Sequence, residues 1–196
     1  MSNILALGNA ACNIVTALEQ YGAYNIYRIQ NEGKKSKNTH IIPELETAEE
    51  YENLKILSKI SFLKNVKDSV TFFVCGASRS SAFSLKILES LHKRKVKIKV
   101  IYFQADMEFS GEKQVKQEKV VRNVMQEYAR SGLFEDITLV SNKTLENFVD
   151  TINVFEYYKQ INDVFCSSFH MIEVFKNTKP VMSTFSRLRE SCRIKT

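Results

Sequence analysis

Residues 70–75 (VTFFVC) form an almost unbroken apolar run, and this run restricts the fold more than any other segment. A strand with one face in water alternates apolar and polar residues, whereas a strand covered on both faces of a parallel sheet does not. The run therefore predicts a central strand of an α/β protein. A turn beginning at Gly76 and a helix with apolar residues along one side are predicted to follow it.

Strand and helix patterns alternate along the whole chain. Further strands are predicted at residues 3–7, 25–29, 96–103 and 137–140, and helices at 10–21, from 47 to about 60, 114–128 and 152–177. Residues 33–38 are predicted to be a polar, flexible loop. This order indicates a doubly wound, mainly parallel sheet whose ligands bind outside the carboxyl ends of the strands. The last helix would be roughly 40 Å long, longer than a usual crossover helix.

The length and composition favour one soluble domain. The chain has 196 residues, of which 44% are hydrophobic and 26% are charged. No apolar run reaches the roughly 20 residues that a membrane span needs, and the N-terminus lacks the pattern of a signal peptide. The four cysteines lie far apart, which predicts free, mostly buried thiols in the reducing cytoplasm and argues against a structural zinc. They are Cys12, Cys75, Cys166 and Cys192.

The net charge of +6 includes two basic clusters, at residues 34–37 and 92–95. Such clusters can contact nucleic-acid phosphates. A solvated loop and a helix end, where the macrodipole favours cations, are the better interpretation, so nucleic-acid binding is disfavoured. The three histidines are scattered, and no nucleophile–base pair for a catalytic triad is recognisable.

Two predicted loops at the carboxyl edge could hold an anion. The first begins with Gly8 and Asn9, and its small residues before a helix would let backbone N–H groups approach a phosphate. Tight strand-to-helix turns use small residues for packing as well, and the loop is neither a Rossmann fingerprint nor a P-loop. The second loop offers hydroxyls and a guanidinium at a helix start, through Ser78, Arg79, Ser80 and Ser81. Its alternative role is simple helix capping.

The order of these loops resembles that of the tubulin/FtsZ superfamily. Residues 8–13 resemble its first glycine-rich loop, and residues 30–32 resemble its Asn-Thr-Asp turn. Residues 72–77 and the serines after them occupy the place of its signature loop. Residues 109–113, 140–143 and 161–164 resemble its Phe-Glu-Gly segment, its Pro-Asn-Asp turn and the Asn-Asp-Val of its central helix.

The resemblance implies a guanine nucleotide, GTP or GDP, as ligand. Asn13, Asn142 and Asp163 would face the base, the Gly8 and Gly76 loops would hold the phosphates, and Ser110 stands where the family has a ribose-contacting Glu. The nucleotide-binding residues implied together are Gly8, Asn9, Asn13, Glu32, Gly76, Ser78, Arg79, Ser80, Ser81, Ser110, Asn142 and Asp163. Residues 1–150 would form the nucleotide-binding-type part, 151–178 the long central helix and 179–196 a tail, all in one compact domain.

The chain also departs from the family pattern. Its signature loop has lost nearly all glycines, and Arg79 would either bind phosphate or fill the pocket. Residues 180–187 hold no carboxylate where the family carries its water-activating acids, and Arg187 stands there instead. We expect the family's second domain to be absent. We therefore expect a degenerate module without its own hydrolysis.

Three functions stay open on the sequence. The chain could be a non-hydrolysing GTP-binding module that regulates or joins a tubulin/FtsZ-like polymer or a homo-oligomer. It could be a scaffold or interaction domain that no longer binds nucleotide. It could also be an unrelated α/β domain that binds a sugar phosphate through its serine-rich loop.

Overall fold

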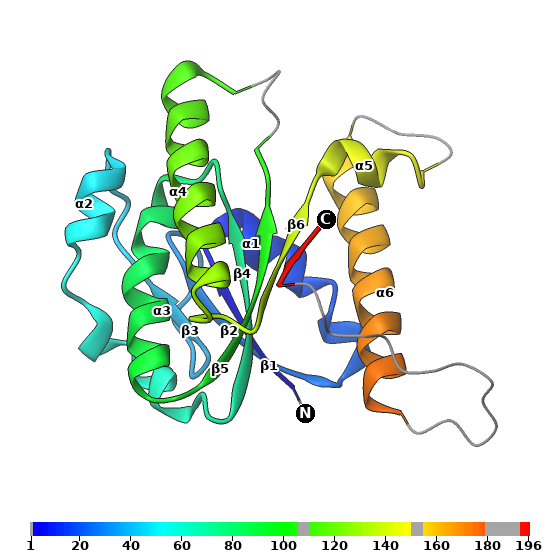
Figure 1. Cartoon of the computed structure of the whole chain (residues 1–196), viewed down its shortest axis with the longest axis horizontal. Coiled ribbons are helices and arrows are strands. Elements are labelled where there is room, and N and C mark those ends of the chain that lie inside the picture. The colour runs from blue at the N-terminus through cyan, green and yellow to red at the C-terminus, as the bar shows by residue number, and fades with distance from the viewer. Residues whose placement is uncertain (1, 106–109, 150–154, 179–192) are drawn as a thin grey trace.

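The computed structural model describes residues 2–105, 110–149, 155–178 and 193–196. One sheet lies between two layers of helices (Figure 1). Its strands are β1 (Ser2–Leu7), β2 (Tyr24–Gln30), β3 (Thr39–Ile41), β4 (Ser69–Cys75), β5 (Lys97–Phe103), β6 (Asp136–Val140) and β7 (Ile194–Lys195). The α-helices are α1 (Asn9–Thr16), α2 (Ala48–Asn53), α3 (Ser84–Lys93), α4 (Glu112–Arg130), α5 (Asn142–Glu146) and α6 (Tyr157–Asn177).

All seven strands run parallel, in the order β3-β2-β1-β4-β5-β6-β7. This confirms the predicted fold class. The chain first builds the sheet outward from β1 to β3 and then returns to add β4 on the other side of β1. Leu7 at the end of β1 consequently pairs with both Ile29 of β2 and Val74 of β4. The loops after β1 and β4 thus meet at the switch point, where open α/β sheets bind ligands.

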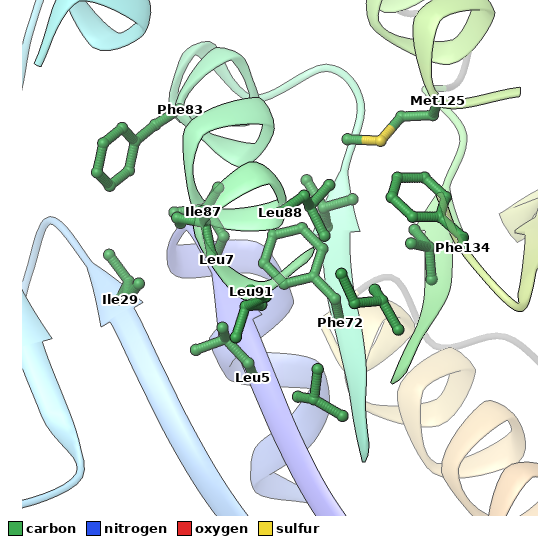
Figure 2. Close-up of a cluster of buried hydrophobic side chains, with 14 of the residues drawn as sticks. Leu5, Leu7, Ile29, Phe72, Phe83, Ile87, Leu88, Leu91, Met125 and Phe134 are labelled. Atoms are coloured by element: carbon green, nitrogen blue, oxygen red, sulfur yellow. The ribbon is translucent and has the colours of Figure 1, made fainter. Parts of the chain in front are cut away.

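The first face of the sheet is covered by α2, α3 and α4. Figure 2 shows Leu5 and Phe72 from the strands packed beneath Leu88 and Leu91 of α3, with Met125 of α4 beside them. All five side chains are fully buried. Burial of each such side chain contributes about 1.5–3 kcal/mol, so this face carries much of the hydrophobic stabilisation.

The second face is covered by α1 and α6. Alternate residues of β1, Ile4 and Ala6, point to this side, as the two-residue period of a strand requires. Phe165 of α6 packs edge-on against Phe103 of β5, with ring centroids 4.9 Å apart, and against Phe73 of β4 at 6.1 Å. These aromatic contacts hold the middle of α6 on the sheet.

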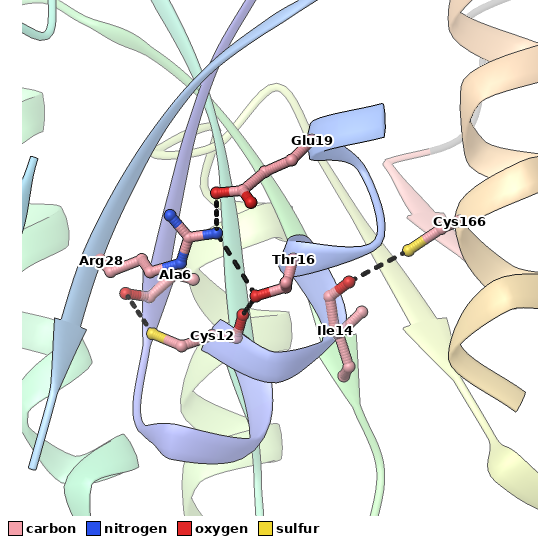
Figure 3. Close-up of polar contacts among 7 residues, drawn as sticks. All are labelled: Ala6, Cys12, Ile14, Thr16, Glu19, Arg28 and Cys166. Carbon is pink, nitrogen blue, oxygen red and sulfur yellow. Dashed lines mark hydrogen bonds and ion pairs between the residues drawn. The ribbon is translucent and has the colours of Figure 1, made fainter. Parts of the chain in front are cut away.

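Polar contacts fix α1 at the β1–β2 end of this face (Figure 3). The Cys12 thiol lies 3.8 Å from the carbonyl oxygen of Ala6, and Arg28 of β2 forms an ion pair with Glu19 at 2.6 Å. Arg28 also lies 3.4 Å from the hydroxyl of Thr16. Because β1 and β2 both hold α1, the loop that starts α1 has a fixed position at the carboxyl edge.

Two strands were missed by the sequence interpretation. β3 has only three residues, and it pairs Thr39 and His40 with the end of β2, immediately after the polar segment 33–38. β7 has two residues and lies in the segment predicted as a tail. Both are edge strands too short to give a periodic pattern. The five strands predicted from apolar runs are confirmed.

Two predicted helices are shorter than expected. α1 ends at Thr16, and the rest of the predicted helix is a 3₁₀ turn, Glu19–Tyr21, which ends at left-handed Gly22. The capping box at Thr47 and Glu50 is confirmed, but α2 ends at Asn53 because Leu54 is extended. Two 3₁₀ turns, Leu57–Lys59 and Ser61–Asn65, follow it and bury Phe62 and Leu63 instead.

The long helix α6 was correctly predicted in type, but only part of its apolar stripe is buried. Ile161, Phe165 and Cys166 are buried. Phe175 and Tyr158, expected on the same stripe, are 53% and 71% exposed because the sheet supports only the middle of the helix. Residues 152–154 lie outside the described residues. Among the helices in the described ranges, none is both long and apolar enough to cross a membrane.

Candidate functional site at the carboxyl edge

The loops after β1 and β4 touch each other through Gly8 and two serines. Gly8 has a φ of 86° and a ψ of 157°, which only glycine adopts readily. A Cβ atom at Gly8 would lie 2.7 Å from Oγ of Ser80 and 3.3 Å from Oγ of Ser78. The two hydroxyls are hydrogen-bonded to each other at 2.7 Å. Glycine is therefore required at residue 8 so that the serine pair can lie against the backbone.

The serine-rich loop is held from below by α4. Gln117 donates from Nε2 to the Ser78 carbonyl at 2.8 Å and to the Ser81 hydroxyl at 3.3 Å. Ser80 and Ser81 are buried, and Ser84 donates to the Ser81 carbonyl. The chain from 79 to 83 is a 3₁₀ helix without a side-chain cap, and α3 begins at Ser84. The loop is thus a rigid turn with hydroxyls facing Gly8.

Gly76 is required for a different reason from Gly8. Its φ is not in the left-handed region, but an added Cβ would overlap the Tyr102 hydroxyl. Tyr102 is fully buried, and its hydroxyl donates to the carbonyl of Glu118 at 3.3 Å. Burial raises the pKa of Tyr102, so it remains a neutral donor. The first residue of the signature-like loop is therefore small because an aromatic side chain passes beside it.

Arg79 points away from the serine pair. Its Nη1 donates to the carbonyl oxygens of Leu45 and Glu46, at 3.1 and 3.0 Å. These residues precede α2, so the guanidinium links the loop after β4 to the start of α2. Arg79 is exposed, and its charge lies close to the carboxyl edge even though Nη1 is engaged.

The loop after β2 is tied to the loop after β1. The side chain of Asn9 accepts from the backbone N–H of Asn31 at 2.9 Å. Asn31 in turn donates to the hydroxyl of Tyr51 at 2.8 Å and to the carbonyl of Pro43 at 2.9 Å. Glu32 is exposed, and its carbonyl accepts from Gln30 at 2.6 Å. Asn9 therefore positions a loop, and the Glu32 carboxylate faces solvent.

Three polar side chains predicted to face a base come from helices that contact each other. Asn13 lies on α1, Asn142 begins α5 and Asp163 lies on α6, and α6 contacts both other helices. Asn13 and Asp163 are exposed and Asn142 is half-buried. Within the described ranges, none of the three side chains makes a hydrogen bond. Their amide and carboxylate groups are free to bind an external partner.

One hydrogen bond joins the two helices that carry Asn13 and Asp163. Figure 3 shows the Cys166 thiol, which donates to the carbonyl of Ile14 at 3.2 Å. In the sequence, Ile14 follows Asn13 and Cys166 comes three residues after Asp163. Burial, with a smaller contribution from the Asp163 charge, raises the pKa of Cys166 to about 12. Burial likewise raises the pKa of Cys12 to about 12. Both thiols are protonated at neutral pH and are not nucleophiles.

The remaining predicted residues are only partly described. Ser110 is half-buried and lies two residues before α4. Residue 109, the segment 180–187 and Cys192 lie outside the described residues. Cys12, Cys75 and Cys166 are free thiols, two of them buried, as predicted. Across the part of the chain that the structure describes, no group of His, Cys, Asp and Glu is arranged to hold a metal ion.

The sequence interpretation missed Gln117 and Tyr51, which organise the site, and did not single out Asn31. Gln117 sits on a helix rich in charged residues and carries no distinctive local pattern. The sequence predicts Tyr51 only as a core residue of the helix. Its hydroxyl also holds the loop before α2, because it accepts from the backbone N–H of Leu45 at 3.1 Å. The only available signal was that buried Tyr hydroxyls need a polar partner.

Comparisons with solved structures identify the fold. The chain is similar to an empty FtsZ dimer from M. jannaschii, with a TM-score of 0.71 and 11% identity over 93% of this chain and 57% of that one. It is similar to a GTPγS-bound protofilament of CetZ2 from Haloferax volcanii, with a TM-score of 0.69 and 16% identity over 94% of this chain and 61% of that one. It is also similar to a GDP-bound CetZ1 monomer from Haloferax volcanii, with a TM-score of 0.68 and 9% identity over 87% and 59%.

The chain spans less than two thirds of the length of each of these proteins. No protein-family model matches the chain, and no curated protein matches it in sequence. At 9–16% identity the likeness concerns the fold, which is tubulin/FtsZ-like with a Rossmann-like parallel sheet.

Proposed function

We propose that this chain binds a guanine nucleotide at the carboxyl edge of its sheet and does not hydrolyse it. The observation that carries the proposal is the unpaired state of Asn13, Asn142 and Asp163 on three helices in contact, in the described part of the chain. A carboxylate at Asp163 can accept two N–H bonds from guanine, and the two amides can each donate and accept. CetZ2 and CetZ1, which share the fold, have been solved with GTPγS and GDP, and this supports the same ligand class.

The phosphates would lie over Gly8 and the serine pair. The Ser78 and Ser80 hydroxyls now bond to each other, and each can instead donate to a phosphate oxygen. The backbone at the start of α1 adds N–H donors and a favourable dipole. Because Nη1 of Arg79 is held by the carbonyls of Leu45 and Glu46 and the side chain points away from the serine pair, the site offers few charged phosphate contacts, so we expect weak binding.

The absence of acids in the segment 180–187 supports a module without hydrolysis. This segment reads PVMSTFSR, and it follows α6, where the tubulin/FtsZ pattern places its acidic residues. A water molecule cannot be activated there by a carboxylate. Purified chain mixed with GTP should therefore release phosphate no faster than buffer does. The free thiols also support the cytoplasm as the location in which the module works.

Calorimetry with base-exchanged nucleotides tests the proposal. GTP should bind the wild-type chain, and ATP should not. Asp163→Asn should lose GTP and gain XTP, because an amide presents one donor and one acceptor, which matches xanthine. Glu49→Gln removes an exposed acid from α2 and serves as the control that changes neither affinity. Equal binding of GTP and XTP by the wild-type chain and by Asp163→Asn would contradict a guanine site.

A second candidate function is assembly without nucleotide. It is favoured by the exposed apolar residues near the end of α6, Met171, Ile172, Val174 and Phe175, which are 47–68% exposed. The relatives solved as a dimer and as a protofilament support association between copies. Sedimentation should then show concentration-dependent association that Phe175→Glu abolishes. Lys159→Gln, at an exposed residue in the first turn of α6 and far from this patch, should leave the association unchanged. Monomer at all concentrations, with no GTP binding, would remove this candidate as well.

A further inference from the structure

A groove with basic side chains lies at the amino edge of the sheet, opposite the candidate nucleotide site. It has a volume of about 580 Å³, within the range of small-molecule sites. The end of α3 and the starts of β5 and β6 form it. Its charged lining residues are Lys93, Lys95, Lys97, Arg193 and Glu135.

Most of these charges have partners that explain them. Lys93 forms an ion pair with Glu89 at 2.6 Å, and Lys97 lies 3.8 Å from Glu135. Arg193 donates to the carbonyl of Arg130 at 3.3 Å, at the end of α4. Lys95 differs from them. It is exposed, and in the described part of the chain its side chain has neither an ion pair nor a hydrogen bond.

The backbone at Lys95 is the feature that needs an explanation. Its φ is 59°, in the left-handed region, where a side chain costs free energy and glycine is preferred. The same turn closes both α3 and α4 beside the groove. After α3, the backbone N–H of Lys95 donates to the carbonyl of His92, and that of Val96 donates to the carbonyl of Leu91. After α4, the backbone N–H groups of Gly132 and Leu133 donate in the same way to the carbonyls of Ala129 and Tyr128. The equivalent positions are thus Lys95 and Gly132.

The two turns therefore have the same left-handed backbone conformation but carry different residues in it, Lys95 and Gly132. Gly132, with a φ of 82°, has the expected residue, and its missing Cβ lets the Arg193 guanidinium lie 2.9 Å from where that atom would be. Lys95 occupies this position although glycine would be less strained. A strained position that presents a free charge into a groove indicates a functional use of the charge.

We propose that this groove binds a small polyphosphate-type anion, with Lys95 as its main ligand and Lys97 and Arg193 as supporting cations. The lining carries one acid against four cations, so a compact ligand with several negative charges is favoured over a neutral or singly charged one. The site is separate from the carboxyl edge, so it does not depend on the proposed nucleotide function.

Calorimetry with inorganic pyrophosphate tests this on the full chain. We expect one saturable site whose affinity falls as salt rises. Lys95→Gly should weaken binding at least tenfold and at the same time raise the Tm by about 2–4 °C, because it relieves the strained φ. Lys97→Gln should weaken binding without raising the Tm. Lys113→Ala removes an equal charge at the far end of α4 and should change neither.

Three results would overturn the proposal. One is pyrophosphate binding that survives both Lys95→Gly and Lys97→Gln. The pyrophosphate site would then lie outside this groove, for example at the carboxyl edge. Another is a Lys95→Gly chain with a lower Tm, since Lys95 would then serve the fold. The third is saturable binding of a short RNA with no pyrophosphate binding, because the groove would then belong to a nucleic-acid surface.

Discussion

The thiol of Cys166 in α6 donates to the carbonyl of Ile14 in α1 at 3.2 Å, which joins helices 152 residues apart in the sequence. The carbonyl belongs to the last turn of α1 and also accepts from the backbone N–H of Ala17 at 3.2 Å. The thiol bond adds a direct polar link between α1 and α6 to the aromatic packing that holds α6 on the sheet. Asn13 precedes Ile14 in α1 and Asp163 lies three residues before Cys166 in α6, so this bond links the two helices that carry these candidate base-site residues.

Cys166→Ala should weaken the attachment of α6. We expect the free energy of unfolding to fall by about 1–2 kcal/mol, because the variant loses a buried hydrogen bond and the packing of a sulfur atom. Hydrogen exchange should become faster across α6 before it does in β4. Cys75→Ala, at a half-buried thiol on β4, is the matched control and should leave exchange in α6 unchanged. An equal effect of both variants on α6 would contradict the assignment.

The buried thiols should make the protein sensitive to alkali. Burial raises the pKa of both Cys12 and Cys166 from 9.0 to about 12, so between those values the unfolded chain loses protons that the folded chain keeps. Stability is then fully present below pH 9 and falls as the pH rises from 9 to 12. Urea unfolding at pH 8, 9 and 10 should show the fall. Cys12→Ala should have a shallower dependence on pH over this range.

Glu118 should make the folded state less stable at neutral pH than at acid pH. It is 1% exposed, and neither carboxylate oxygen has a hydrogen-bond partner among the described residues, although Arg122 lies 3.6 Å away. Burial raises the pKa of Glu118, so its contribution to stability is fully present below the ordinary value and is lost as the pH rises through the folded one. The difference in unfolding free energy between Glu118→Gln and the wild type should therefore grow from pH 4 to pH 7. Glu127→Gln, on the exposed side of α4, is the control and should show no such growth.

Gly8→Ala should destabilise the chain through both its backbone and its neighbour. We expect a loss of about 2 kcal/mol, from a φ of 86° and from the approach of the new methyl group to Oγ of Ser80. In a Ser80→Ala background the loss should be smaller, because the hydroxyl is absent and only the backbone strain remains. A double-mutant cycle by urea unfolding measures the coupling. A coupling of zero would show that the serine pair moves aside freely.

The central sheet could be predicted because its strands leave strong local patterns. Residues 70–75 are apolar on both sides, and β4 is buried between two helical layers. β3 could not be predicted, because Thr39 and His40 become buried only through pairing with β2 and the packing around it. β7 is set by the position of β6, where Lys195 meets Asp136 at 2.7 Å, and not by its own two residues.

For the candidate site, the sequence predicted which loops lie at one edge of the sheet but not which side-chain contacts they make. The resemblance placed Gly8 and the serines at one edge, and the structure brings them into contact. The direction of Arg79 could not be predicted, since it depends on the carbonyls of Leu45 and Glu46, more than thirty residues earlier. Long-range partners of this kind are decided by tertiary packing, which local sequence does not encode.

The pairing of β1 with β4 has a consequence for synthesis of the chain. Asn3 pairs with Val70, so β1 lacks one of its two neighbouring strands until the ribosome has made β4. At about 10 residues per second, the ribosome takes several seconds to reach β4. During that interval Leu5 and Leu7, which end fully buried, lack α3 and α4, two of the helices that cover their face of the sheet. The side chains of β1 that face α3 therefore stay exposed in the nascent chain, and the speed of translation from residue 30 to the end of α3 sets for how long.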